Sequence, residues 1–153
     1  MMTNLTVRPA TQSDLGTIVD FNARLALETE GLLIDREILE QGVGALLADG
    51  SRGCYNMASS EGRPVGQMMH TREWSDWRNG YIWWLQSVYV DPDHRQCGVF
   101  RALYDHLLKL AKADPDVVGL RLYVAEGNQS AQLTYERLGM TRPGYLVMQY
   151  LVT

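Results

Sequence analysis

The chain has 153 residues, a length typical of one domain that buries most of the surface its unfolded form exposes, so we expect a single domain over residues 1–153. Its formal net charge is −4 with both signs spread along the chain, which argues against a nucleic-acid partner. No apolar run or signal-like N-terminus indicates a membrane, and Cys54 and Cys97 lack metal-ligand spacing, so we expect a cytoplasmic protein with no metal.

The first half of the chain predicts a strand, two helices and three further strands. Residues 5–8 form a short strand, and the pattern Thr11-x-x-Asp14 is typical of a helix N-terminus before apolar residues at helical spacing. A second helical region covers residues 31–48. Three consecutive strands follow, at residues 54–60, 65–74 and 81–90.

The second half of the chain alternates helices and strands. Apolar residues at i, i+3, i+4 and i+7 predict a helix from Phe100 to Ala111. A strand over residues 118–124, a helix that contains Tyr135 and a last strand over residues 145–152 complete the order β-α-α-β-β-β-α-β-α-β. This order predicts an α/β (α+β) fold, with a mixed central sheet of about six to seven strands flanked by about four helices.

Residues 87–101 carry the strongest functional signal. They have the pattern of a strand, a turn marked by Pro92, a loop that contains Gly98, and the start of a helix. A helix N-terminus presents unpaired backbone N–H groups and the positive end of the helix dipole, so this arrangement is typical of phosphate binding. Arg95 adds a charge that can pair with phosphate. The spacing matches neither Gly-x-x-x-x-Gly-Lys-Ser/Thr nor Gly-x-Gly-x-x-Gly.

Two motifs give the chain a resemblance to a known family. They are Val88-x-Val90-x-Pro92 followed by Arg95-x-x-Gly98-x-Phe100, and then Asn128-x-x-Ala131-x-x-x-Tyr135-x-x-x-Gly139-Met140. Their order, and a separation of roughly thirty residues with one helix and one strand between them, resemble the signature of the GNAT superfamily of N-acetyltransferases. The departures are Phe100, where the family usually has Gly or Ala, and Met140, which stands for its Phe.

The resemblance implies the GNAT acyltransferase fold and acetyl-coenzyme A (acetyl-CoA) as cofactor. The positions that it implies for cofactor binding are Val88, Tyr89, Val90, Arg95, Gln96, Cys97, Gly98, Val99, Phe100, Arg101, Asn128, Ala131 and Tyr135. The pantetheine arm is expected to pair with the strand that ends at Pro92, as an added strand would. The alternative is an ordinary central strand whose backbone is fully paired.

Acetyl transfer from a thioester to an amine needs a neutral amine, stabilisation of the negative charge on the thioester oxygen, and a proton for the departing thiolate. The resemblance implies that Tyr135 supplies the proton, for which a phenol with a pKa near ~10 is adequate. Periodicity alone also fits Tyr135 as a core aromatic residue, and the two roles are compatible. The contact to the oxygen is implied for the Val88 N–H.

The general base is less well marked in the sequence. Some family members have a glutamate six residues before the position of Val90, where this chain has Trp84. An alkylamine is almost wholly protonated at pH 7, so some route of deprotonation is needed, and a carboxylate that acts through water would provide it. The segment between the first two helices lines the acceptor site in this fold, which favours Glu28 and Glu30 as catalytic residues. The alternatives are Glu73 and Asp76, and each of these acids could also be a solvated surface residue.

We therefore expect an acetyl-CoA-dependent N-acetyltransferase that moves an acetyl group directly to a primary amine of a small molecule or peptide. The alternative is a non-catalytic acyl-CoA-binding module with the same fold. The acidic segment over residues 26–35 favours an acceptor that carries positive charge. All tryptophans fall within residues 74–84, where they fit an acceptor-site wall, a homodimer contact or the core, and the sequence leaves these alternatives open.

Overall fold

The structure is a computed structural model that describes residues 4–153, and the chain divides into two compact units, Met1–Leu122 and Tyr123–Thr153. The first unit contains β1 (Leu5–Pro9), α1 (Leu15–Glu30), α2 (Arg36–Ala48), β2 (Cys54–Ser60), β3 (Arg63–Ser75), β4 (Gly80–Val90), α3 (Val99–Ala113) and β5 (Val117–Leu122). Short 3₁₀ turns precede α1 at Gln12–Asp14 and α3 at Pro92–His94. The second unit contains α4 (Gln129–Arg137).

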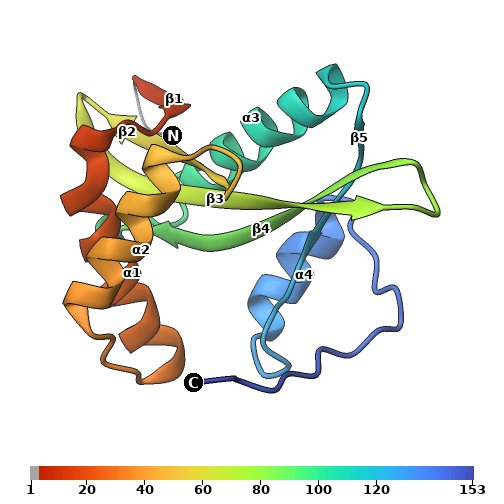
Figure 1. Cartoon of the computed structure of the whole chain (residues 1–153). Coiled ribbons are helices and arrows are strands. Elements are labelled where there is room, and N and C mark those ends of the chain that lie inside the picture. The colour runs from red at the N-terminus through yellow and green to blue at the C-terminus, as the bar shows by residue number, and fades with distance from the viewer. Residues whose placement is uncertain (1–3) are drawn as a thin grey trace. The chain divides into compact units, whose positions relative to one another are not determined.

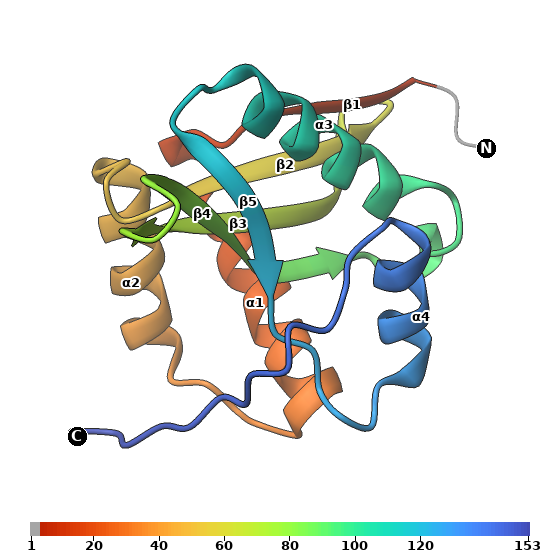
Figure 2. The same ribbon diagram turned by 90° about the vertical axis from the view of Figure 1, so that its right-hand side faces the viewer.

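The sheet of the first unit is mixed, as the sequence predicts. Its strand order is β1-β2-β3-β4-β5, with antiparallel pairing from β1 to β4 and parallel pairing between β4 and β5. Helices α1 and α2 pack on one face of the sheet, and α3 packs on the opposite face (Figure 1 and Figure 2). The α/β fold class and the helix count of about four are confirmed.

The strand count among residues 4–153 is lower than predicted, because residues 145–152 have no regular secondary structure. Their side chains are exposed; the large apolar ones are Tyr145, Leu146, Val147, Met148, Tyr150, Leu151 and Val152. The prediction of a strand rested on β-branched and aromatic composition. A segment of such composition forms a strand only if its backbone N–H and C=O groups also pair with a neighbouring strand.

The two predicted N-terminal helices are present, but the second begins later than expected. Gly31 ends α1 in the left-handed conformation, with φ of 62°, which glycine adopts without steric cost. Asp35 then caps α2, and its Oδ1 accepts hydrogen bonds from the N–H groups of Glu37 at 2.9 Å and Ile38 at 3.2 Å. Residues 31–35 are therefore a connection between two capped helices rather than part of a helix.

Close contact between β3 and α3 fixes the start of α3. A Cβ on Gly66 of β3 would lie 2.8 Å from Cγ1 of Val99, the first residue of α3, and 3.1 Å from the Tyr89 carbonyl oxygen. A side chain at Gly66 would therefore push α3 away from the sheet. Val99 and Leu103 of α3 are buried at this contact. The N-terminus of α3 is thus held directly against the sheet.

A buried histidine makes stability depend on pH. His70 of β3 is 5 % exposed and stacks on Trp83, with 4.2 Å between ring centroids. Its Nδ1 is buried and has no hydrogen-bond partner within residues 4–153. Burial, with a smaller contribution from Arg72, lowers the pKa of His70 from 6.5 to about 4. The unfolded chain therefore binds a proton at His70 more tightly than the folded one.

The free energy of unfolding should therefore decrease as the pH falls from 6.5 toward 4. Below pH 4 the contribution of His70 to this decrease is about 3 kcal/mol. The variant His70→Phe keeps an aromatic ring on Trp83 and has no group to protonate. Urea unfolding at pH 7.5 and at pH 4 should show a smaller loss for the variant than for the native protein. Equal losses would contradict the assignment, since the carboxylates contribute to both proteins alike.

Candidate active site

The loop between β4 and α3 presents backbone donors. Gln96 and Gly98 have positive φ angles, of 61° and 85°, and Gly98 is the N-cap of α3. Within residues 4–153, the N–H groups of Gln96, Cys97 and Gly98 donate no hydrogen bond. The N–H groups of Val99 and Arg101, in the first turn of α3, have no carbonyl acceptor inside the helix. This donor set suits an anionic group such as a phosphate, so the residues present fit the pyrophosphate of a coenzyme A molecule.

Arg95 lies beside this loop and is bound to α1. Its Nη2 donates to Glu28 Oε2 at 2.6 Å, and its Nε donates to the Val90 carbonyl oxygen at 3.0 Å. The guanidinium lies 5.6 Å from the centre of the Tyr89 ring. The Glu28 carboxylate raises the pKa of Arg95 above its ordinary value, so the guanidinium stays charged. Arg95, which is predicted to bind phosphate, is therefore ion-paired with Glu28, which is predicted to lie at the acceptor site.

Glu28 and Glu30 both lie in the last turn of α1, and both are exposed. Glu28 Oε1 also accepts a hydrogen bond from the Tyr89 hydroxyl at 3.4 Å. Burial and the Glu28 charge raise the pKa of Tyr89. Glu30 has no ion pair or hydrogen bond to its side chain in the described part of the chain. Residues two apart do not share a helix face, so the two carboxylates point in different directions.

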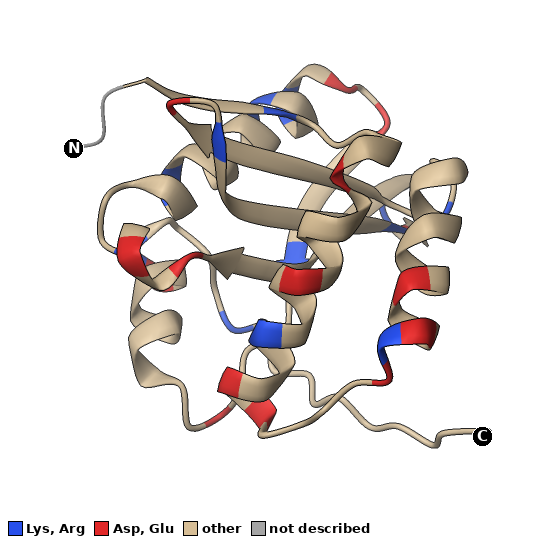
Figure 3. Cartoon of the chain, turned by 90° about the vertical axis from the view of Figure 1, so that its left-hand side faces the viewer, with Lys and Arg blue, Asp and Glu red and all other residues tan. Residues whose placement is uncertain are grey.

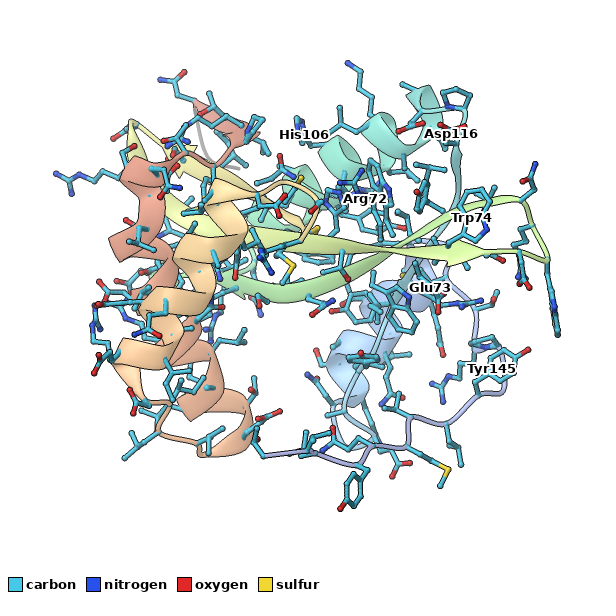
Figure 4. The ribbon with its side chains drawn as sticks, viewed as in Figure 1. Arg72, Glu73, Trp74, His106, Asp116 and Tyr145 are labelled. Carbon is cyan, nitrogen blue, oxygen red and sulfur yellow. The ribbon has the colours of Figure 1, made fainter. Side chains whose placement is uncertain are left out.

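The other acids weighed from the sequence have different surroundings. Glu73 of β3 accepts a hydrogen bond from Arg121 of β5 at 3.2 Å, and its side chain lies on the opposite side of β3 from those of Arg72 and Trp74 (Figure 4). Asp76 accepts from the Trp77 N–H at 2.9 Å in the turn between β3 and β4. Acidic residues also lie along α1, along α2 and in the connection between them (Figure 3). This face attracts a cationic ligand more than the turn at Asp76 does.

Strand β4 is irregular just before the loop that leads to α3. Its pairing with β3 steps from Gln67↔Tyr89 to Met69↔Gln86, so Ser87 and Val88 of β4 lie opposite Met68 alone. This arrangement is a β-bulge, and Ser87 has a φ of 49°, which costs a residue other than glycine about 1–2 kcal/mol. The pairing of β4 with β5 ends at Leu85↔Leu122.

The structure also shows two polar residues that the sequence motifs do not contain. Gln67 of β3 and Asn22 of α1 are buried, and Gln67 donates to the Ser87 carbonyl oxygen at 3.1 Å. The only available sequence signal was a lone glutamine within the otherwise apolar run over residues 65–69. A buried glutamine needs partners, but the sequence does not say which.

The second unit holds the remaining predicted residues. Asn128 caps α4, and its Oδ1 accepts from the Ala131 N–H at 3.2 Å. Tyr135 lies in the last turns of α4 and is half-buried, and its carbonyl accepts from the N–H groups of Leu138 and Met140 at 3.1 Å each. Burial raises the pKa of Tyr135 above 10, so its hydroxyl keeps its proton at neutral pH. Asn128 and Ala131 thus have a local structural role in starting the helix that carries Tyr135.

Comparison with known proteins agrees with this fold. The sequence model of the acetyltransferase (GNAT) family matches residues 27–140. A crystal structure described as a possible acetyltransferase from Clostridium difficile 630 is 43 % identical, with a TM-score of 0.91, over 97 % of this chain and 98 % of that chain. The chain therefore belongs to the GNAT family of acetyltransferases. A search of curated proteins gave no match.

Two more distant structures share the fold. Ribosomal-protein-alanine N-acetyltransferase from Brucella melitensis biovar Abortus 2308 is 18 % identical, with a TM-score of 0.77, over 95 % of this chain and 99 % of that chain. Glucosamine-6-phosphate N-acetyltransferase from Arabidopsis thaliana is 16 % identical, with a TM-score of 0.74, over 97 % and 99 %. Among the described helices of the present chain, none is long and apolar enough to cross a membrane.

Proposed function

We propose that this acetyltransferase uses acetyl-CoA to acetylate a primary amine of a small molecule or peptide by direct transfer. The observation that carries the proposal is the donor loop over residues 95–101, which opens onto the N-terminus of α3 in a chain of the GNAT family. The family match runs through both compact units, which supports the proposal that residues 1–153 act as one domain.

Each binding residue has a proposed task. The N–H groups from Gln96 to Arg101 bind the pyrophosphate of coenzyme A, and Arg95 adds a charge-assisted hydrogen bond. Val88, Tyr89 and Val90 of β4 lie beyond the last pair that β4 forms with β5, and their backbone binds the pantetheine arm on that side, as an added strand would. When bound, acetyl-CoA supplies the acetyl group as an activated thioester.

Two groups of the chain act on charge and protons at the reacting carbonyl. The Val88 N–H donates a hydrogen bond to the carbonyl oxygen as negative charge develops there. Tyr135 donates its phenolic proton to the departing thiolate sulfur. The raised pKa of Tyr135 supports this task, because the hydroxyl remains protonated across the neutral range. Both tasks follow the attack of a neutral amine on the carbonyl carbon: the C–N bond forms, a base takes the proton of the amine, and the C–S bond then breaks to release the thiolate.

Glu28 and Glu30 are the proposed bases and contacts of a cationic acceptor. Glu30 is available as it stands, because no described residue pairs with it, whereas Glu28 becomes available only when Arg95 leaves it. Either carboxylate can take the proton directly or through one water molecule. The acidic face formed by α1 and α2 supports an acceptor with positive charge (Figure 3).

Single substitutions separate recognition from base catalysis. We expect Glu28→Gln or Glu30→Gln to raise the KM for the amine about tenfold if the carboxylate only binds the cation. Loss of the basic group from the pH profile of kcat/KM would identify the general base. Glu28→Gln should in addition bind coenzyme A more tightly, because Arg95 is released for phosphate. Glu37→Gln, on α2, is the control, and full activity in both variants would redirect attention to Glu73 and Asp76.

The function itself is tested by thiol release from acetyl-CoA with a panel of amines. The panel contains polyamines, aminoglycosides, amino acids, amino sugars and peptide N-termini. It is broad because the names of the two distant proteins refer to different acceptors, a protein alanine and an amino sugar phosphate. We expect amine-dependent release of coenzyme A and an acetylated product detected by mass spectrometry. Binding of acetyl-CoA without turnover on any amine would instead support the non-catalytic acyl-CoA-binding module.

A further inference from the structure

The bulge in β4 contains the peptide group between Ser87 and Val88, whose C=O and N–H groups make different contacts. Ser87 C=O and Val88 N–H belong to the same peptide, and the described chain has no cis peptide bonds. In a trans peptide the C=O and N–H bonds lie in one plane and point in opposite directions. Any contact that fixes the direction of the Ser87 carbonyl therefore also fixes the direction of the Val88 N–H.

Gln67 provides such a contact. Its side chain is 0 % exposed, and its Nε2 donates to the Ser87 carbonyl oxygen at 3.1 Å and to Asn22 Oδ1 at 3.0 Å. Asn22 Nδ2 donates in turn to the Tyr55 hydroxyl at 2.9 Å. A backbone carbonyl only accepts hydrogen bonds, so the amide nitrogen of Gln67, and not its oxygen, faces Ser87. The network thus connects β4 through β3 and α1 to β2.

The network is more than packing. The Gln67 Oε1 atom is buried without a hydrogen-bond partner in the described residues, which is unfavourable for folding. An apolar side chain of the same length would fill this position without that cost, but it could not hold a carbonyl. The positive φ of Ser87 also needs surroundings that keep it in place. One of these unfavourable features is in Ser87 itself, and the other is in the side chain that binds the Ser87 carbonyl.

We propose that Gln67 is a positioning residue that aims the Val88 N–H at the reacting carbonyl oxygen, with Asn22 holding the Gln67 amide in orientation. The inference rests on the proposed function, which gives the Val88 N–H its role. Gln67 touches neither cofactor nor acceptor in this scheme and acts through the Ser87–Val88 peptide alone. Its loss therefore affects the chemical step rather than the binding of acetyl-CoA.

The test compares Gln67→Met with the control Gln86→Met. Gln86 is also a glutamine of the paired strands β3 and β4. It is a suitable control because its side chain donates to the Thr71 side chain, at 2.7 Å, and not to a backbone carbonyl. We expect Gln67→Met to lower kcat about 10²-fold, as for a reacting group misplaced by about 1 Å, with the acetyl-CoA Kd unchanged within about twofold. Gln86→Met should retain the native kcat. Equal kcat values in the two variants would overturn the inference.

A second readout does not depend on turnover. Residual dipolar couplings in ¹⁵N-labelled protein report the direction of the Val88 N–H bond, which should change in Gln67→Met and stay native in Gln86→Met. An unchanged direction in Gln67→Met overturns the inference even if the enzyme is active. A native protein without amine acetylation contradicts the proposed function, while the couplings still decide the role of Gln67. If Gln67→Met does not fold, Asn22→Leu removes the other acceptor and should shift the same coupling.

Discussion

Tyr135→Phe is expected to lower kcat about 10²–10⁴-fold, the range typical of a lost general acid, while the Kd for coenzyme A stays near its native value. The substitution removes only the hydroxyl, so the ring keeps its half-buried place on α4. Steady-state kinetics with the acceptor found by the panel, together with calorimetry of coenzyme A binding, measure the two quantities separately.

The matched control is Tyr145→Phe, which removes the same hydroxyl from an exposed tyrosine of the second unit (Figure 4). It should retain native kinetics. The raised pKa of Tyr135 adds a pH signature: kcat should fall on the alkaline side only above the range of an ordinary phenol, and this loss should be absent in Tyr135→Phe. An unchanged kcat in Tyr135→Phe would mean that another group protonates the thiolate.

Arg95→Ala is expected to raise the Kd for coenzyme A about 10- to 100-fold, the effect of losing a charge-assisted hydrogen bond to phosphate. The free energy of unfolding should change little, because the Arg95–Glu28 pair is exposed and such pairs contribute about 1 kcal/mol or less. Calorimetric titration and urea unfolding of the same sample give both values.

Arg36→Ala is the control for Arg95→Ala. Arg36 is also exposed and also pairs with acids, Asp20 at 2.7 Å and Glu40 at 3.2 Å, but it lies at the start of α2. The control should bind coenzyme A as the native protein does. If both variants bound equally well, Arg95 would serve only to connect α1 to the loop, and the backbone N–H groups would bind the phosphate alone.

The features that sequence predicted well are those that neighbouring residues determine. The capping pattern at Thr11 and Asp14 is present, with the Thr11 N–H donating to Asp14 Oδ2 at 2.7 Å. The helix from Phe100 to Ala111 lies inside α3, because its apolar spacing needs no information from elsewhere in the chain. The sequence also placed Gly98 in the loop just before this helix, and in the structure Gly98 is the left-handed N-cap of α3.

The features that sequence did not predict depend on residues far apart in the chain. Glu28 and Arg95 are ion-paired through the packing of α1 beside β4, which no motif shows. The hydrogen bond from Gln67 to the bulge likewise depends on the exact register of β3 against β4. The predicted strand over residues 145–152 failed for the related reason that strand formation needs a paired neighbour, which composition does not reveal.

The central claim is that the chain is an acetyltransferase whose loop over residues 95–101 binds acetyl-CoA, and isothermal titration of the native protein with acetyl-CoA tests it most directly. We predict saturable binding at one site per chain, competed by free coenzyme A and weakened in Arg95→Ala. A native, folded protein that shows no binding of acetyl-CoA or coenzyme A, by heat or by equilibrium dialysis, would contradict the account.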